Sequence, residues 1–175
     1  SSVTYANNGL DWLALYTVDA SDTSGDVTYK IVFNDLADNA GISVNEGTGS
    51  VEANIDITAP TMEITADDGV SDGDTSNDST LSLIFTSSEA TSNFEVDDIT
   101  VSGGALSSFA ATSSTVYTAT FTPSGSGATT VDVASSKFTD AVGNNNTAAT
   151  QFNWTYNGAA SLDTTPPILS SVSIV

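Results

Sequence analysis

Apolar and polar residues alternate along most of the chain with a period of two. The clearest runs are residues 12–18, 27–33 and 81–85, where an apolar or aromatic residue stands at every second position. Further runs of the same kind occupy residues 51–57, 62–64, 99–101, 117–121, 131–133 and 152–156. Thr and Ser fill many intervening positions, which is typical of strands with one face in solvent. Because turn-forming Gly, Asn, Asp and Ser clusters separate the runs, the pattern predicts an all-β chain, folded as an antiparallel sandwich.

Three landmarks recur along the chain in the same order and at a nearly constant offset. The segment D-I-T-A-P at 56–60 returns as D-T-T-P-P at 163–167, 107 residues later. F-N-D-L-A-D-N at 33–39 returns as F-T-D-A-V-G-N at 138–144, at an offset of 105. Tyr16 followed by Ser24-Gly25 returns as Tyr117 followed by Ser126-Gly127. A repeat of about 105 residues is the size of one small β-sandwich domain and indicates a tandem array.

The repeat also predicts the domain boundaries. Residues 1–58 are expected to be the C-terminal part of a first repeat, and residues 59–158 a complete repeat. Residues 159–175 are then a linker and the first strand of a third repeat. The joints at 56–60 and 163–167 contain proline, which restricts its own backbone and that of its predecessor. Short, stiff joints between like domains favour a rod over a flexible tether.

Charge and composition exclude several classes of function. The chain carries 22 acidic residues against two lysines, for a net charge of −20. Such a surface repels nucleic acid and anionic membranes but attracts divalent cations. No run of 18 apolar residues occurs, so no membrane insertion is expected. His and Cys are absent, which removes the usual general base, thiol nucleophile and zinc ligands. The sequence therefore predicts a protein that is not an enzyme.

Three motifs together resemble a known family. They are the D-x-T-x-P joint at 56–60, the F-x-D-x-x-G-N turn at 138–144, and the run FTSSEATSNFEVDDITVSGG at 85–104. The chain is similar in these respects to the bacterial-type immunoglobulin-like tandem repeats of large extracellular surface proteins, such as adhesins, surface-layer proteins and filaments. The resemblance implies Greek-key β-sandwich repeats stacked outside the cell, often with calcium at the joints. The first copy departs from the motif, because Asp38 stands where the family has Gly.

The strongest metal candidate in the sequence is the segment D-G-D-T-S-N-D at 72–78. Asp72, Asp74 and Asp78 place hard oxygen ligands around a glycine turn, as in the first half of a calcium loop. Leu83 stands where such a loop needs its last carboxylate, so Asp67 or Asp68 would have to complete the shell. The alternative is a solvated hairpin rich in turn-forming residues.

The aspartates of the two joints form a second metal candidate. From the resemblance, Asp56 and Asp163 are expected to share a calcium ion with a turn of the neighbouring domain, near Asp140 or Asp35. The alternative is that each aspartate only caps the turn before Thr-x-Pro.

The aromatic residues have two interpretations. Trp12, Trp154 and the tyrosines could form a platform for sugar stacking. Trp154 alternates with Phe152 and Tyr156, however, and this pattern favours packing in the core.

The sequence thus predicts a non-catalytic structural repeat of an extracellular surface protein or filament. It would serve as a spacer or stalk, in a surface layer, or in a polymerising fibre. The alternative is an adhesive module that recognises a glycan or a host surface through its loops. The expected partners are neighbouring repeats or further copies of the chain. One form of such a contact is donation of strand 163–175 into the incomplete repeat at 1–57.

Overall fold

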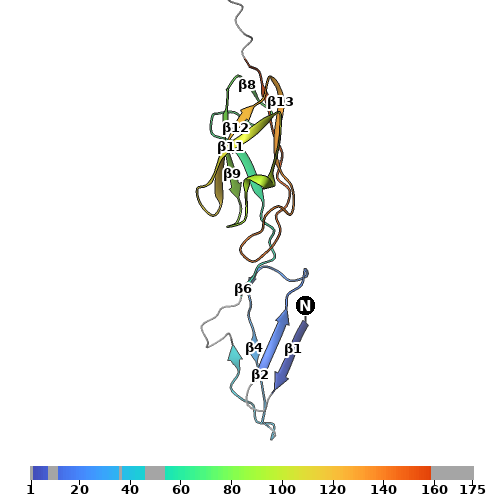
Figure 1. Cartoon of the computed structure of the whole chain (residues 1–175). Helices are drawn as coiled ribbons and strands as arrows, with labels where there is room; N and C mark the ends of the chain where they lie inside the picture. Colours follow the sequence, from blue (N-terminus) through green and yellow to red (C-terminus); the bar gives the residue numbers. More distant parts are fainter. Residues whose placement is uncertain (1, 8–11, 36, 46–53, 159–175) are drawn as a thin grey trace, which may run out of the picture. The chain divides into compact units, whose positions relative to one another are not determined.

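The structure is a computed structural model that describes residues 2–7, 12–35, 37–45 and 54–158 (Figure 1). The chain divides into two compact units. The first unit is Ser1–Ala59 with Val142–Asn144, and the second is Pro60–Ala141 with the residues from Asn145 onward. The boundary predicted between residues 58 and 59 lies next to this division. Within the described residues, the structure contains no helix with the length and apolar character needed to cross a bilayer.

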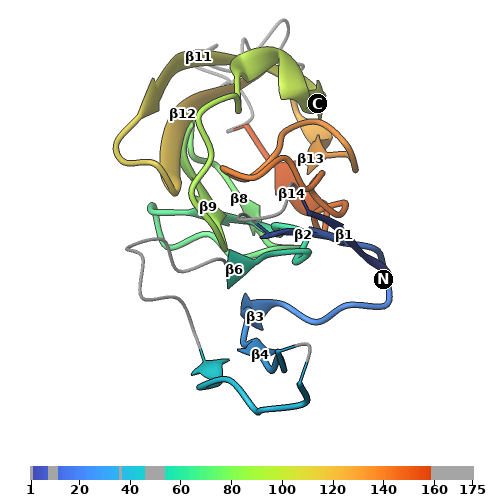
Figure 2. The same cartoon turned by 90° about the horizontal axis from the view of Figure 1, so that it is seen from below.

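The second unit is a sandwich of two four-stranded sheets, seen as two layers in Figure 2. One sheet has the order β11-β12-β9-β7, from β7 (Met62–Ala66), β9 (Leu81–Ser87), β11 (Gly104–Ala111) and β12 (Val116–Pro123). The other has the order β10-β13-β14-β8, from β8 (Thr75–Ser76), β10 (Ile99–Ser102), β13 (Gly127–Val133) and β14 (Phe152–Tyr156). All neighbours are antiparallel except β8 and β14, which run parallel.

The strand order is that of an immunoglobulin-type Greek key. The first, third, fifth and sixth strands of the unit form one sheet, and the fourth, seventh and eighth form the other, with the short β8 added at its edge. In the immunoglobulin fold the corresponding strands are A, B, D and E in one sheet and C, F and G in the other. The predicted all-β immunoglobulin-like sandwich is therefore confirmed for this unit.

The core of the second unit lies between the two sheets and follows the predicted alternation. In β9, Leu81, Leu83 and Phe85 are buried, while the residues between them face outward or are half-buried. Trp154 is 2% exposed and packs edge-on against Phe121, with ring centroids 6.1 Å apart. The prediction that Trp154 belongs to the core is confirmed, which removes it from any surface platform for sugars. The side chain of Trp12 lies outside the described residues.

A loop residue closes one end of this core. Phe94 lies between β9 and the 3₁₀ turn η1 (Val96–Asp98), and it is 4% exposed. Its ring lies 5.0 Å from that of Tyr117 and 5.3 Å from that of Phe138, both in edge-on contacts. It also contacts Phe85 at 5.9 Å and Phe109 at 5.8 Å. This aromatic cluster links both sheets to the loops beside it.

In its described residues, the first unit contains three pairs of strands. β1 (Ser2–Asn7) pairs with β2 (Trp12–Thr17), β3 (Gly25–Asp26) with β6 (Asn54–Ile55), and β4 (Lys30–Ile31) with β5 (Val44–Asn45). The predicted strand at 27–33 is present only in part, as β4. Of the predicted strand at 51–57, residues 51–53 lie outside the described residues.

The turn that begins the seventh strand of the second unit has a counterpart in the first unit. Gly25 has φ 141° and Gly127 has φ 143°. Ser24 Oγ accepts the backbone N–H of Ile57 at 3.1 Å, and Ser126 Oγ accepts that of Gly158 at 3.0 Å. The predicted correspondence of Ser24-Gly25 with Ser126-Gly127 is thus visible in the backbone of both units.

A second loop shows the same correspondence at an offset of 105. Isolated bridges join Asn34 to Ala40 and Thr139 to Asn145. Asp38 has φ 64° where Gly143 has φ 103°, so both positions lie in the region that favours glycine. Asp tolerates the left-handed region better than most residues. The substitution of Asp for the Gly of the motif therefore keeps the turn.

Candidate functional site

The carboxylates of the predicted calcium loop at 72–78 bind backbone groups. Asp72 Oδ1 accepts the backbone N–H of Asn153 at 2.6 Å and its side-chain Nδ2 at 3.2 Å. Asp74 Oδ2 accepts the backbone N–H of Ser71 at 2.7 Å. Asp78 is exposed. The first two aspartates therefore fix the path of the loop, and Asp72 also ties it to β14.

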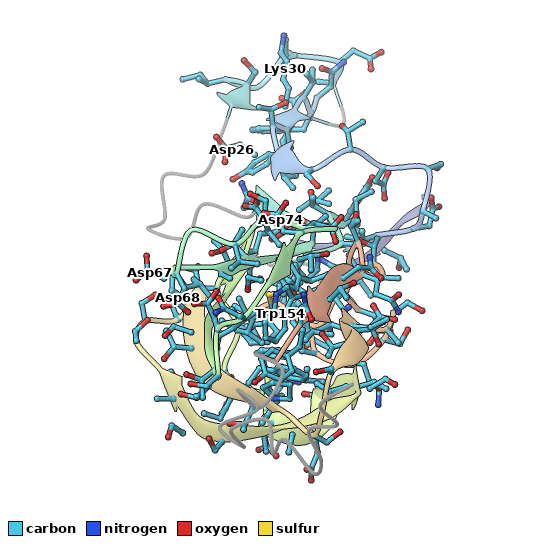
Figure 3. The ribbon with its side chains drawn as sticks, turned by 90° about the horizontal axis from the view of Figure 1, so that it is seen from above. Asp26, Lys30, Asp67, Asp68, Asp74 and Trp154 are labelled. Carbon is cyan, nitrogen blue, oxygen red and sulfur yellow. The ribbon has the colours of Figure 1, made fainter. Side chains whose placement is uncertain are left out.

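Asp67 and Asp68 lie at the rim of the second unit, as Figure 3 shows. Asp68 accepts the backbone N–H of Ser82, and the backbone N–H of Asp67 donates to the carbonyl of Ser82 at 2.9 Å. Among the described residues, no three carboxylates of the set Asp67, Asp68, Asp72, Asp74 and Asp78 lie within 4.8 Å of one another. Asp163 lies outside the described residues.

The second unit brings two other carboxylates together. Oxygen atoms of Glu89 and Asp140 lie within 4.8 Å of each other, and Asp140 is only 7% exposed. Two negative charges this close, one of them buried, repel each other unless a cation or a proton compensates them. Sequence reasoning singled out Asp140 only as a partner of Asp56, and it missed Glu89. The signal for Glu89 was its place in the motif at 85–104.

Asp56 occupies a turn in the joint. Its Oδ1 accepts the backbone N–H of Thr58 at 3.0 Å, which is the local capping role given above as its alternative. Its carbonyl accepts Nδ2 of Asn144 at 3.1 Å.

Asp35 in the first unit closes its own loop. Its carboxylate accepts the side chain of Asn39 at 2.8 Å and the backbone N–H groups of Asn39 at 2.9 Å and Ala37 at 2.8 Å. These bonds, with that from the Asn39 side chain foremost, lower the pKa of Asp35 below its usual 3.8. Asp35 therefore has a structural role in the loop, whatever else it binds.

Asn146 fixes the loop between β13 and β14, and sequence reasoning missed it. The side chain is 2% exposed. Its Oδ1 accepts the backbone N–H groups of Lys137 at 2.7 Å and Phe138 at 3.0 Å. Its Nδ2 donates to the carbonyls of Ala134 at 2.9 Å and Thr147 at 2.7 Å. These four bonds hold the loop that carries Asp140.

The parallel contact between β8 and β14 joins the two ends of the second unit. Gly73 N–H donates to the Asn153 carbonyl at 2.7 Å, Thr155 N–H to the Asp74 carbonyl at 2.9 Å, and Asn157 N–H to the Ser76 carbonyl at 2.7 Å. Trp154 Nε1 adds a bond to Ser76 Oγ at 2.9 Å. Together with the two bonds of Asp72, these contacts couple a strand near the start of the unit to its last strand.

Comparison with known proteins gives one match. A family model described as a bacterial Ig-like domain matches residues 56–156. No curated protein and no solved structure matches the chain. The matched range begins at Asp56 and ends at the last residue of β14, so it contains every strand that the structure describes in the second unit.

Proposed function

The chain belongs to the bacterial immunoglobulin-like domain family, and on this premise we propose that it is a non-catalytic structural segment of an extracellular surface protein or filament. Domains of this family are typically found outside the cell and generally lack catalysis. The proposed role is to extend a surface protein and to resist tension along its length.

The observation that carries this proposal is the parallel pairing of β8 with β14. Force applied to the two ends of the second unit pulls β14 by its C-terminal end, and it reaches β8 by its N-terminal end once β7 has separated from β9. Because the strands run parallel, they must slide along each other, and the three backbone bonds between them are loaded together. An antiparallel terminal pair would instead open one bond at a time. The geometry suits a module that stays folded under tension.

Single-molecule pulling tests the proposal. We expect the second unit to unfold in one event that releases about 30–35 nm of chain, from ~3.4 Å per residue over the matched range. Asp72→Ala removes the acceptor for both Asn153 bonds, so the unfolding force should fall. Asp78→Ala, an exposed acid of the same loop, should leave the force unchanged. Unfolding of the unaltered chain without a distinct force peak would contradict a mechanical role.

We also propose that the domain binds calcium through Glu89 and Asp140. The support is the close and partly buried carboxylate pair in the second unit, which suits a hard cation with oxygen ligands. When bound, calcium would cancel the repulsion between the two carboxylates and stiffen the loop at 134–151.

Thermal unfolding in calcium and in EDTA, at matched ionic strength, tests the metal proposal. A ligand that binds only the folded state stabilises it by about 2.7 kcal/mol at one hundred times its dissociation constant. We expect millimolar calcium to raise the melting temperature of the chain, and the double variant Glu89→Gln, Asp140→Asn to lose this response. Asp97→Asn, an exposed acid on η1, should keep it. Equal melting temperatures in calcium and in EDTA would contradict the proposal that the domain binds calcium.

A further inference from the structure

The first unit has an apolar face whose counterparts in the second unit are buried. Tyr29, Ile31 and Phe33 are 45%, 51% and 54% exposed. Counted from the shared glycine turn, Tyr29 corresponds to Val131 and Ile31 to Val133. Counted from the shared loop, Phe33 corresponds to Phe138. These three residues of the second unit are 2%, 0% and 1% exposed.

A groove runs along this face. It has a volume of about 780 Å³ and is lined by Tyr16 of β2, Tyr29, Ile31 of β4 and Ile55 of β6, with the turn at 22–26 at one end. The apolar lining alternates along the chain, as on the inner face of a sandwich sheet. Leu15 and Val32, at intervening positions, do not line the groove and are also exposed.

The second unit shows what kind of structure covers such a face. Val133 and Val131 stand opposite Ile99 and Val101 of β10. The ring of Phe138 is covered by that of Phe94, and β12 is paired with β9. In the first unit, within the described residues, β2 pairs only with β1, and β3 and β4 pair only with β6 and β5. The described part of the first unit therefore corresponds to the fifth to eighth strands of the second, with their partners β7 to β10 lacking an equivalent.

We propose that this face is a docking surface for a complementary half of an immunoglobulin-like repeat, a polypeptide with the strands and apolar alternation of residues 60–103. One of its strands would add to the open edge of β4, and its apolar residues would fill the groove. A single strand, such as 163–175, could pair with one edge of the sheet but could not also form the second layer that covers the groove. It therefore does not fit the whole face. Strand addition gives affinity through backbone bonds and specificity through the alternate side chains.

The register of this docking follows from the second unit. Thr100 of β10 stands opposite Asp132, and Ser102 opposite Thr130. Gly25 corresponds to Gly127, and Lys30 and Asp132 each lie five residues after that glycine, so Lys30 corresponds to Asp132. A docked segment should therefore place its equivalent of Thr100 opposite Lys30, and its equivalent of Ser102 two positions away.

The experiment adds a synthetic polypeptide of residues 60–103 to the full chain. The chain contains no cysteine, so a disulfide can form only between the introduced thiols and shows which two positions are adjacent. We expect Lys30→Cys in the chain to form a disulfide with a Thr100→Cys probe but not with a Ser102→Cys probe, since diagonal neighbours lie about 7–8 Å apart. Amide exchange at residues 25–33 should slow by about tenfold or more on binding.

Two variants of the chain serve as matched controls. Ile31→Asp, which puts a charge into the groove, should abolish both signals. Ile42→Asp, at a side chain that is 90% exposed and does not line the groove, should preserve them. Absence of protection and of the in-register disulfide would overturn the proposal. So would concentration-dependent protection without the probe, which would assign the face to a second copy of the chain.

Discussion

At the scale of single residues, the loops of the second unit depend on side chains that replace backbone pairing. Asn146 makes four hydrogen bonds with main-chain groups and has no polar atom left over. A buried amide that satisfies four main-chain groups is costly to remove, because each group left without a partner has also lost its contact with water.

Asn146→Ala should therefore destabilise the second unit by about 3 kcal/mol, as estimated from the cost of buried unsatisfied groups. Urea unfolding followed by Trp154 fluorescence measures the change. Asn145→Ala is the matched control, since that side chain is exposed, and it should change stability by less than about 0.5 kcal/mol. A similar loss in both variants would show that the bonds of Asn146 contribute little.

The carboxyl of Asp35 gives a prediction about pH. Its folded pKa is lower than its usual value, so its contribution to the loop is present at neutral pH and is lost as the pH falls below 3.8 through the folded pKa. An NMR titration should place the midpoint of Asp35 below 3.8. Asn39→Ala removes the foremost cause and should move the midpoint upward. A midpoint that does not respond to this variant would contradict the assignment.

The residue-scale chemistry was the least predictable part of the sequence. Asn146 stands in a run of three asparagines, a composition that indicates a turn but not which amide is buried. Asp72 and Asp74 have the spacing of metal ligands, but the same short acids serve equally well as acceptors for backbone N–H groups. Glu89 and Asp140 are 51 residues apart in the sequence, and only the path of two loops brings them together.

At the scale of elements, alternation predicted the long strands because it records which face of a sheet is buried. Leu81–Ser87 and Phe152–Tyr156 follow it closely. It could not predict β8, because a two-residue strand has no period, and its pairing depends on the distant β14. It also gave no sign that Phe94, in an irregular segment, is the centre of the aromatic cluster.

Phe94→Ala should cost about 3–5 kcal/mol, the range for a buried Phe whose cavity does not collapse. We expect a cost in this range because the Phe94 ring contacts four other aromatic rings. Val96→Ala, two residues further on and 41% exposed, should cost much less. Thermal or urea unfolding of the full chain makes the comparison. If the two variants unfold alike, the loop does not close the core.

At the scale of the whole molecule, charge is the dominant surface property. With 22 acidic residues and two lysines, most charges have the same sign, and compaction of the chain raises their mutual repulsion. Salt screens this repulsion, because the Debye length falls from about 30 Å at 0.01 M to about 3 Å at 1 M.

Raising sodium chloride from 0.01 to 1 M should therefore raise the melting temperature of the second unit. A gain of about 1 kcal/mol corresponds to roughly 4–8 °C for a domain of this size. Differential scanning calorimetry measures the shift. An unchanged or lower melting temperature would mean that self-repulsion is not a significant cost of folding here.

The central claim is that the chain contains a self-contained immunoglobulin-like module at residues 56–158. The most direct test is a polypeptide of residues 56–158 alone, followed by circular dichroism, sedimentation and amide exchange. We predict an all-β monomer with cooperative unfolding, in which the slowest amides belong to β9, β12, β13 and β14, the strands that are paired on both sides. A disordered polypeptide, or one that folds only with residues 1–55 attached, would contradict the claim.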